Sequence, residues 1–229
     1  MKFFVTGTDT DSGKTLVTSA LLHKVNVSHV NVRSLGLKPI ASGCEQTEKG
    51  LRNSDALALI EQSSIELDYC LVNPISFLPA IAPHIAASQA GVDISPGAIL
   101  AKIQQSLASA SLSETDVCFI EGAGGWRLPL GEGHFLSEVV KELELDVILV
   151  VGVKLGCLNH AVLTQESIKA DGLTIKGWVA NIVDPQTSCL EENLASLHHL
   201  MESPCLGIVP HLDYVSAEAA AEHLDISEL

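Results

Sequence analysis

One stretch near the start, Lys2-Phe-Phe-Val-Thr-Gly-Thr-Asp-Thr-Asp-Ser-Gly-Lys-Thr15, constrains the fold of this chain most strongly. Residues 3–6 are apolar or β-prone and predict a short buried strand, which a glycine-bounded loop joins to a helix starting at Gly13. The ending Gly13-Lys14-Thr15 is typical of a phosphate-binding P-loop. In such a loop, backbone N–H groups and the helix N-terminus face an anion, the lysine reaches the outer phosphates, and the hydroxyl ligates Mg²⁺.

The match to the pattern G-x-x-x-x-G-K-[ST] is incomplete. Gly7 comes one residue too early, and Thr8 stands where the first glycine is expected. The flanking segments favour the P-loop, because an apolar strand precedes it and residues 16–22 follow with helical apolar spacing. An ordinary strand–turn–helix capped by Thr or Asp is the alternative.

Composition limits the function classes. The chain has 229 residues and 47% hydrophobic residues, which fits one α/β domain spanning residues 1–229. No apolar run is long enough to span a bilayer, and residues 1–6 lack the layout of a signal peptide, so we expect a cytoplasmic protein. The formal net charge of −15 argues against nonspecific binding to nucleic acid or to an anionic membrane. Among the few cations, Lys14, Lys38 and Lys154 lie beside Gly or Pro loops.

Strand and helix patterns alternate along the chain. Strands are predicted at residues 3–6, 32–37, 116–120, 147–153, 176–183 and 205–209, and helices at 13–25, 53–62, 84–90, 95–108, 135–143, 159–170, 189–201 and 216–224. Residues 41–52 and 72–83 are expected to be irregular. This alternation predicts a mostly parallel sheet with helices on both faces, whose ligands bind beyond the carboxyl ends of the strands.

Three side chains, two near predicted strand ends and one near a predicted helix start, are candidates for phosphate chemistry. Glu121 ends an apolar strand and precedes Gly-Ala-Gly-Gly, so it is either a Mg²⁺ ligand opposite the P-loop or a solvent-facing carboxylate. Lys38 is either a charge that steadies a phosphoryl group or a solvated lysine. Asp55 is either a metal ligand or an acid placed favourably at a helix N-terminus.

Six segments, in order, resemble the dethiobiotin synthetase family of P-loop enzymes. They are the loop stretch ending at Thr15, Lys38-Pro-Ile-Ala-Ser-Gly43, Gly50-Leu-Arg-Asn-Ser-Asp-Ala56, Glu121-Gly-Ala-Gly-Gly-Trp126, Val150-Val-Gly-Val-Lys-Leu-Gly-Cys-Leu-Asn-His160 and Gly177-Trp-Val-Ala-Asn181. The resemblance implies ATP-dependent carboxylation and ring closure of 7,8-diaminopelargonate with CO₂ or bicarbonate, through a carbamate and a carbamic–phosphoric anhydride. Mg²⁺ is the implied cofactor and ATP the co-substrate.

The resemblance also implies roles for residues. Lys14, Lys38 and Thr10 would be catalytic, Thr15, Asp55 and Glu121 would hold Mg²⁺, and Ser42 would contact the substrate. The implied nucleotide contacts, besides the metal set, are Asp11, Ser12, Gly13, Lys14, Leu16, Gly122, Ala123, Gly124, Asn181, Pro210, His211 and Leu212. Family members are homodimers, so Gly156, Cys157, Leu158 and Asn159 of one subunit would receive the substrate carboxylate in the other subunit's site. Ile182 departs from the polar residue familiar after Asn181.

Two other function classes share this fold core. A P-loop ATPase switch that positions cell components usually carries an additional loop lysine and often a basic, membrane-seeking helix. Residues 8–12 contain no lysine, and the segment 218–229 is acidic. An amidotransferase-like synthetase would need a glutaminase nucleophile, and no cysteine of the chain stands in an obvious nucleophile elbow with a downstream histidine.

Overall fold

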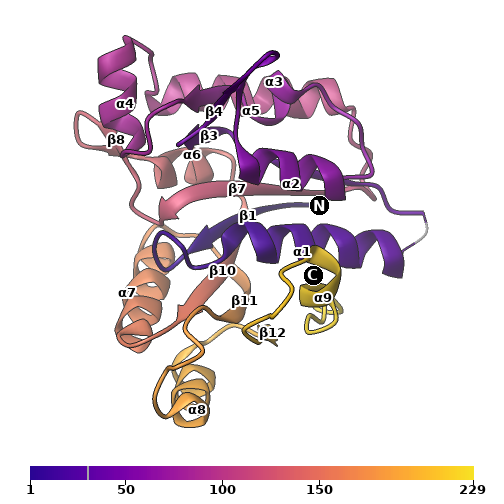
Figure 1. Cartoon of the computed structure of the whole chain (residues 1–229), viewed down its shortest axis with the longest axis vertical. Helices are drawn as coiled ribbons and strands as arrows, with labels where there is room; N and C mark the ends of the chain where they lie inside the picture. Colours follow the sequence, from indigo (N-terminus) through magenta and orange to yellow (C-terminus); the bar gives the residue numbers. More distant parts are fainter. Residues whose placement is uncertain (30) are drawn as a thin grey trace.

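The computed structural model describes residues 1–29 and 31–229 and is built around one six-stranded parallel sheet (Figure 1). The strand order across this sheet is β12-β11-β10-β1-β7-β2. The strands are β1 (Lys2–Gly7), β2 (Ser34–Leu37), β7 (Val117–Gly125), β10 (Asp146–Val153), β11 (Ile175–Ile182) and β12 (Cys205–Val209). The predicted parallel α/β architecture is therefore confirmed. Since all six strands run the same way, their carboxyl ends meet along one edge of the sheet.

Both faces of the sheet are covered by helices. Along β10, Val147, Leu149 and Val151 pack into one apolar cluster, while Ile148 and Val150 pack into a second cluster on the opposite face. This two-residue alternation, with apolar side chains on both faces, is expected of a buried parallel strand. The helices α1 (Lys14–Ser28) and α9 (Ala217–Ala221) contribute to the second cluster, and α5 (Pro96–Ala110), α6 (Leu136–Glu142), α7 (Cys157–Ala170) and α8 (Leu190–Leu200) contribute to the first.

Local capping explains several predicted helix ends. Asn53 precedes α2 (Ser54–Gln62), and its side-chain oxygen accepts a hydrogen bond from the Ala56 N–H at 3.2 Å. Ser95 accepts one from the Ala98 N–H at the start of α5. Gly91 follows α4 (Pro83–Ala90) with a left-handed φ of 64°, a conformation that suits glycine at a helix C-terminus.

The two segments expected to be irregular are partly regular, so that prediction is wrong. The strands β3 (Ile40–Ser42) and β6 (Ile75–Phe77) pair in parallel, and β4 (Glu45–Thr47) forms an antiparallel hairpin with β5 (Gly50–Arg52). A four-residue helix, α3 (Tyr69–Val72), precedes β6. Strands of three residues are too short to display a polar–apolar alternation, and prolines at positions 39, 74 and 79 hid them further.

Two predicted boundaries near strand ends also change. The strand predicted at 116–120 continues as β7 to Gly125, because its glycines run alongside β1, where Gly7 pairs with Gly125. Helix α7 starts at Cys157 and not at Asn159, with Gly156 as its N-cap at a φ of 95°. A short hairpin of β8 (Pro129–Gly131) and β9 (His134–Phe135) follows β7. Across residues 1–29 and 31–229, every helix is too short or too polar to cross a membrane.

An ion pair between a half-exposed guanidinium and a buried carboxylate joins the starts of two neighbouring strands. The Asp116 carboxylate is buried and accepts hydrogen bonds from the Arg33 guanidinium, at 3.2 and 2.5 Å, and from the Ser113 N–H at 2.7 Å. The hydrogen bonds from Arg33, followed by that from Ser113, hold the pKa of Asp116 well below its usual value. A carboxyl whose pKa is lowered by folding stabilises the folded state above its unfolded pKa, and that contribution is lost as the pH falls toward the folded pKa.

We therefore expect Asp116→Asn to lower the free energy of unfolding at pH 7. The difference from the wild type should shrink as the pH falls below about 4, where the unfolded carboxyl binds a proton. Urea unfolding at pH 7, 5 and 3 measures this difference, with Asp146→Asn, at an exposed carboxylate, as the matched control. A difference that stays constant over this range would contradict the assigned role of the pair.

Candidate active site

The loop between β1 and α1 is held tightly against the sheet. Asp11 and Gly13 have left-handed backbone conformations, with φ of 60° and 87°. A Cβ on Gly13 would lie 1.9 Å from the Asn181 amide nitrogen, and a Cβ on Gly7 would lie 2.0 Å from the Ser12 hydroxyl. Both positions therefore require glycine. Gly7, which comes one residue early for the standard pattern, makes room for the buried Ser12 side chain.

Lys14 bends back over this loop. Its ammonium donates a hydrogen bond to the Asp9 carbonyl at 3.0 Å, and Lys154 forms an ion pair with the Asp9 carboxylate at 2.5 Å. Burial and the nearby positive charge of Lys38 lower the pKa of Lys14, against the opposing effect of Glu121 and other carboxylates. A cation held in this way, with few partners of its own, suits an incoming polyanion.

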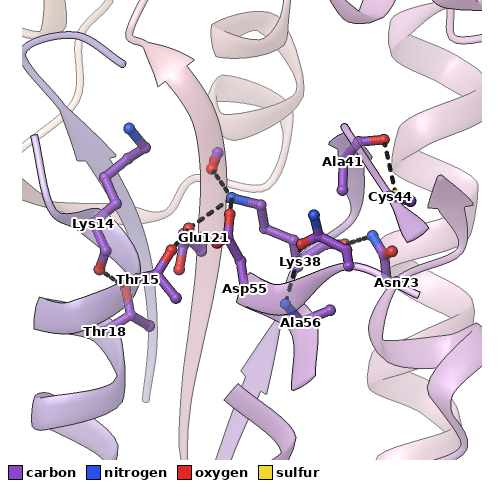
Figure 2. Close-up of polar contacts among 12 residues, drawn as sticks. Lys14, Thr15, Thr18, Lys38, Ala41, Cys44, Asp55, Ala56, Asn73 and Glu121 are labelled. Carbon is purple, nitrogen blue, oxygen red and sulfur yellow. Dashed lines mark hydrogen bonds and ion pairs between the residues drawn. The ribbon is translucent and has the colours of Figure 1, made fainter. Parts of the chain in front are cut away.

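Lys38, Glu121 and Asp55 meet beside the loop (Figure 2). The Lys38 ammonium donates to Glu121 Oε1 at 2.6 Å and to the Gly122 carbonyl at 3.0 Å, and lies 3.0 Å from Asp55 Oδ2. An ammonium has three donors, so these three acceptors use all of them. The Thr15 hydroxyl also donates to Glu121 Oε1, at 2.8 Å. The sequence prediction that these residues share one site is consistent with this geometry.

Two of the three charged side chains in this cluster are buried. Lys38 is 3% exposed and Glu121 0% exposed, whereas the Asp55 side chain is 37% exposed at the edge of the site. Burial opposes the charge on Lys38, but Glu121 and Asp55 outweigh that effect, so the pKa of Lys38 is raised. Lys38 therefore stays protonated at neutral pH and can act as a fixed positive charge.

One oxygen of Glu121 lacks a partner. Glu121 Oε2 is buried and accepts no hydrogen bond from the described residues. A buried carboxylate oxygen without a partner is costly unless a ligand or ion completes it. Together with the Asp55 carboxylate and the Thr15 hydroxyl, it offers the hard oxygen ligands that Mg²⁺ prefers. In the described part of the chain, no group of three His, Cys, Asp or Glu side chains could bind a metal alone, so phosphate oxygens and water would complete the shell.

A cavity of about 910 Å³ opens above this cluster. Eleven of the predicted site residues line it: Thr10, Asp11, Gly13, Lys14, Thr15, Lys38, Ser42, Asp55, Glu121, Ala123 and Gly124. The lining also includes a set of apolar residues, which we call the apolar wall: Ala80, Ile81, Ala82, Pro83 and Leu128. The spacing of apolar residues along the sequence did not predict this wall, because its residues lie in and beside the connections around β6, α4 and β8, where no regular spacing occurs. The cavity thus joins a charged end to an apolar wall.

The other predicted site residues do not line the cavity. Ser12 is a buried residue of the loop, and the buried Asn181 amide donates to its carbonyl at 3.0 Å. Leu16 lies on α1. Gly122 contributes its carbonyl to Lys38 and passes against the Phe4 ring. Pro210, His211 and Leu212 follow β12, and Gly156, Cys157, Leu158 and Asn159 begin α7.

Sequence comparison gives the family. A family model described as an AAA domain matches residues 1–219. The ATP-dependent dethiobiotin synthetase BioD of Pseudomonas aeruginosa strain UCBPP-PA14 is 51% identical over 227 residues, which are 99% of this chain and 97% of that protein. The protein of the same name from Cellvibrio japonicus strain Ueda107 is 49% identical over 99% of this chain and 96% of its own length. The chain belongs to the dethiobiotin synthetase family.

Solved structures share the fold at much lower identity. The ParA family ATPase from Chlorobium tepidum TLS superimposes with a TM-score of 0.53 and 14% identity, over 96% of this chain and 90% of that one. This likeness shows that the chain shares the fold of that ATPase. At 14% identity it carries no information about the reaction.

Proposed function

We propose that this chain is an ATP-dependent dethiobiotin synthetase. It would join CO₂ to a vicinal diamine, 7,8-diaminopelargonate, and close a cyclic urea while ATP is cleaved to ADP and phosphate. Family membership at 51% identity over nearly the full length supports this proposal. The structural observation that supports it best is the pair of buried lysines, Lys14 and Lys38, facing one cavity in a chain of net charge −15.

The chemistry has three steps. One amine of the diamine adds to CO₂ and loses a proton, which gives a carbamate. A carbamate oxygen then attacks the γ-phosphorus of ATP and displaces ADP, forming a carbamic–phosphoric anhydride. The second amine adds to the carbamate carbon, phosphate leaves with the C–O bond electrons, and loss of a proton completes the urea. Phosphorylation is needed because an oxide is a poor leaving group and phosphate is a good one.

The two lysines take different parts in this sequence. Lys14, which leads α1, would place its ammonium on the β- and γ-phosphates while the loop N–H groups hold the other phosphate oxygens. Lys38 would stabilise the negative charge that is shared between the carbamate oxygen and the transferring phosphoryl group. Its position is fixed beforehand by three acceptors, so little reorganisation is required when the charge moves.

Mg²⁺ would be held by Thr15, Asp55 and Glu121. When bound, it would neutralise part of the charge on the phosphate oxygens and fix their orientation. The orphaned Glu121 Oε2 fits this role. Ser42 Oγ is likewise buried without a hydrogen-bond partner among the described residues, and it lines the cavity near the apolar wall of Ala80–Pro83. It would hydrogen-bond the diamine or carbamate while the wall packs on the aliphatic chain.

A product assay tests the proposed function. The protein is incubated with MgATP, bicarbonate and the diamine, and the cyclic urea, ADP and phosphate are quantified. We expect the three products in equal amounts, with ADP formation dependent on the diamine. ATPase activity that needs no diamine and rises on addition of lipid vesicles would instead favour a switch ATPase. Absence of the urea with folded protein would refute the proposal.

We further propose that the enzyme is a homodimer in which the N-terminus of α7 completes the partner's site. Among the described residues, no side chain caps this helix. The Cys157 N–H donates to the Lys154 carbonyl at 3.0 Å, and the N–H groups of Leu158 and Asn159 would be available to a carboxylate. Leu155, directly before it, is 97% exposed, and Leu163 in the same helix is 55% exposed, which suits an interface covered by a second copy.

A variant with an added negative charge tests this arrangement. Asn159 is exposed in the first turn of α7, where an acid is favourable for the helix but repels a bound carboxylate. We therefore expect Asn159→Asp to raise the KM for the diamine about 10-fold or more with little change in thermal stability. Sedimentation velocity should give a dimer for both proteins.

Mixing two impaired variants locates the shared site. Dimers of Lys38→Met and of Asn159→Asp would each be impaired, but a hybrid dimer would contain one site with both residues intact. After subunit exchange, assays at low diamine concentration should recover about a quarter of wild-type activity, since half of the dimers are hybrids with one good site of two. No recovery from hybrids that have formed would show that α7 does not serve the other subunit.

A further inference from the structure

The backbone of Lys38 is held on both sides by the segment around α3. The Lys38 N–H donates to the Val72 carbonyl at 2.9 Å, and the Lys38 carbonyl accepts from the Asn73 amide at 2.6 Å. Figure 2 shows Asn73 at the Lys38 backbone, while Asp55 and Glu121 meet its ammonium. Lys38 is therefore anchored at its backbone and at the tip of its side chain by different elements.

A chain of hydrogen bonds runs from Asn73 to the start of α2. The Tyr69 hydroxyl donates to Asn73 Oδ1 at 2.9 Å and accepts from the Asn53 N–H at 2.8 Å. Asn53 in turn caps α2 through the Ala56 N–H. Asp55 lies in the first turn of this helix and reaches the Lys38 ammonium at 3.0 Å. The contacts thus form a closed ring through Lys38, Asn73, Tyr69, Asn53 and Asp55.

We infer that Tyr69 and Asn73 are positioning residues for the proposed synthetase reaction, which set the placement of Lys38 relative to Asp55. The inference depends on the proposed function for its activity readouts. Neither residue lines the cavity, so both would act through Lys38 and Asp55 and not on the substrate. Their hydroxyl and amide link two groups that come from separate parts of the chain, the end of β2 and the start of α2.

The surroundings of the ring favour a fixed geometry. Asn73 is 2% exposed and Asn53 5% exposed, so loss of a partner leaves a polar group without water to replace it. The Arg52 guanidinium lies 4.0 Å from the centre of the Tyr69 ring, which holds the ring while the hydroxyl makes its two contacts. Catalysis depends on close placement of the reacting groups, so a shift of about 1 Å in Lys38 or Asp55 can reduce the rate roughly 100-fold.

The test removes only the Tyr69 hydroxyl. Tyr69→Phe keeps the ring and its contact with Arg52, and Tyr214→Phe is the matched control because the chain's other tyrosine is 81% exposed. We expect Tyr69→Phe to lower kcat by about 10-fold and to raise the Mg²⁺ concentration for half-maximal activity, as changes to residues behind a metal site commonly do. The KM for the diamine should stay within about twofold, since the variant changes no cavity wall.

A binding measurement gives a readout independent of turnover. Calorimetry compares ADP affinity with Mg²⁺ and with EDTA, and Tyr69→Phe should weaken the affinity only in the presence of Mg²⁺. Asn73→Ala and the double variant Tyr69→Phe with Asn73→Ala complete a double-mutant cycle. The double variant should lose little more Mg²⁺-dependent ADP affinity than Asn73→Ala alone, because both residues act through one chain of hydrogen bonds.

The outcomes separate the two proposals. If Asn73→Ala does not fold, the inference is tested by the kcat, Mg²⁺ dependence and ADP affinity of Tyr69→Phe compared with those of Tyr214→Phe. A Tyr69→Phe protein with a lower melting temperature but with wild-type kcat, Mg²⁺ dependence and ADP affinity would have lost only stability, and this would overturn the inference. A wild-type protein that forms no cyclic urea would overturn the proposed function, while the Mg²⁺-dependent ADP affinities would still test the ring.

Discussion

Replacing Lys14 by alanine is expected to lower kcat by roughly 100- to 1,000-fold and to leave the protein at least as stable as the wild type. Among the described residues, the ammonium makes one hydrogen bond, to the Asp9 carbonyl, although Lys14 is only 7% exposed. Burial and Lys38 both disfavour its charge, and its pKa is lowered accordingly. The fold therefore gains little from Lys14, whereas the phosphates of ATP would gain a close counter-charge.

Two measurements check this separation of stability from turnover. Thermal unfolding of Lys14→Ala without nucleotide should match or exceed the wild type, and single-turnover formation of ADP should be slow even at saturating ATP. Lys102→Ala, on the exposed surface of α5, is the matched control for loss of a positive charge. An unchanged kcat in Lys14→Ala, or a large loss of stability without nucleotide, would contradict the role assigned to Lys14.

The central architecture could be predicted because long apolar strands carry a strong pattern. Val147–Val153 forms the middle of the sheet as β10, and its apolar residues alternate between the two faces. Parallel strands also place their carboxyl ends together, so Lys38 and Glu121 could be assigned to one edge although 83 residues separate them. Thr15, which follows β1 through the loop, meets them there.

The connections could not be predicted in the same way. The strands β3 and β6 are three residues long and owe their pairing to tertiary packing, which leaves no period in the sequence. The same applies to Tyr69 and Asn73, since a single hydroxyl and a single amide bridge elements that lie far apart along the chain. A polar residue buried through its partners resembles an exposed loop residue until those partners are known.

Asn181 shows a different limit of sequence reasoning. The family resemblance implied that Asn181 contacts the nucleotide, and Asn181 lies near the end of β11. In the structure its amide nitrogen donates to the Ser12 carbonyl from beneath the loop, against Gly13. The end of a parallel strand places a residue near the ligand-binding edge of the sheet, but the direction of its side chain depends on the residues that pack beside it. The nucleotide contact of Asn181 stays a prediction.

Replacing Lys38 by methionine should reduce both stability and turnover, in contrast with Lys14. Glu121 is fully buried and would lose the ammonium at 2.6 Å, which costs about 3–5 kcal/mol of unfolding free energy for a charge left without its partner. Turnover should fall by roughly 1,000-fold, since the fixed charge on the transferring phosphoryl group is gone. Urea unfolding and the ADP assay measure the two effects separately.

A second substitution distinguishes the two causes. In Lys38→Met with Glu121→Gln, the buried carboxylate is neutral, so most of the lost stability should return, because a buried ion pair replaced on both sides is often close to neutral in cost. Turnover should not return, since neither the ammonium nor the proposed Mg²⁺ ligand is restored. If the double variant stayed as unstable as Lys38→Met, the destabilisation would come from packing and not from charge. If it regained turnover, Lys38 would be a structural counter-ion to Glu121 and not the group that stabilises the transferring phosphoryl.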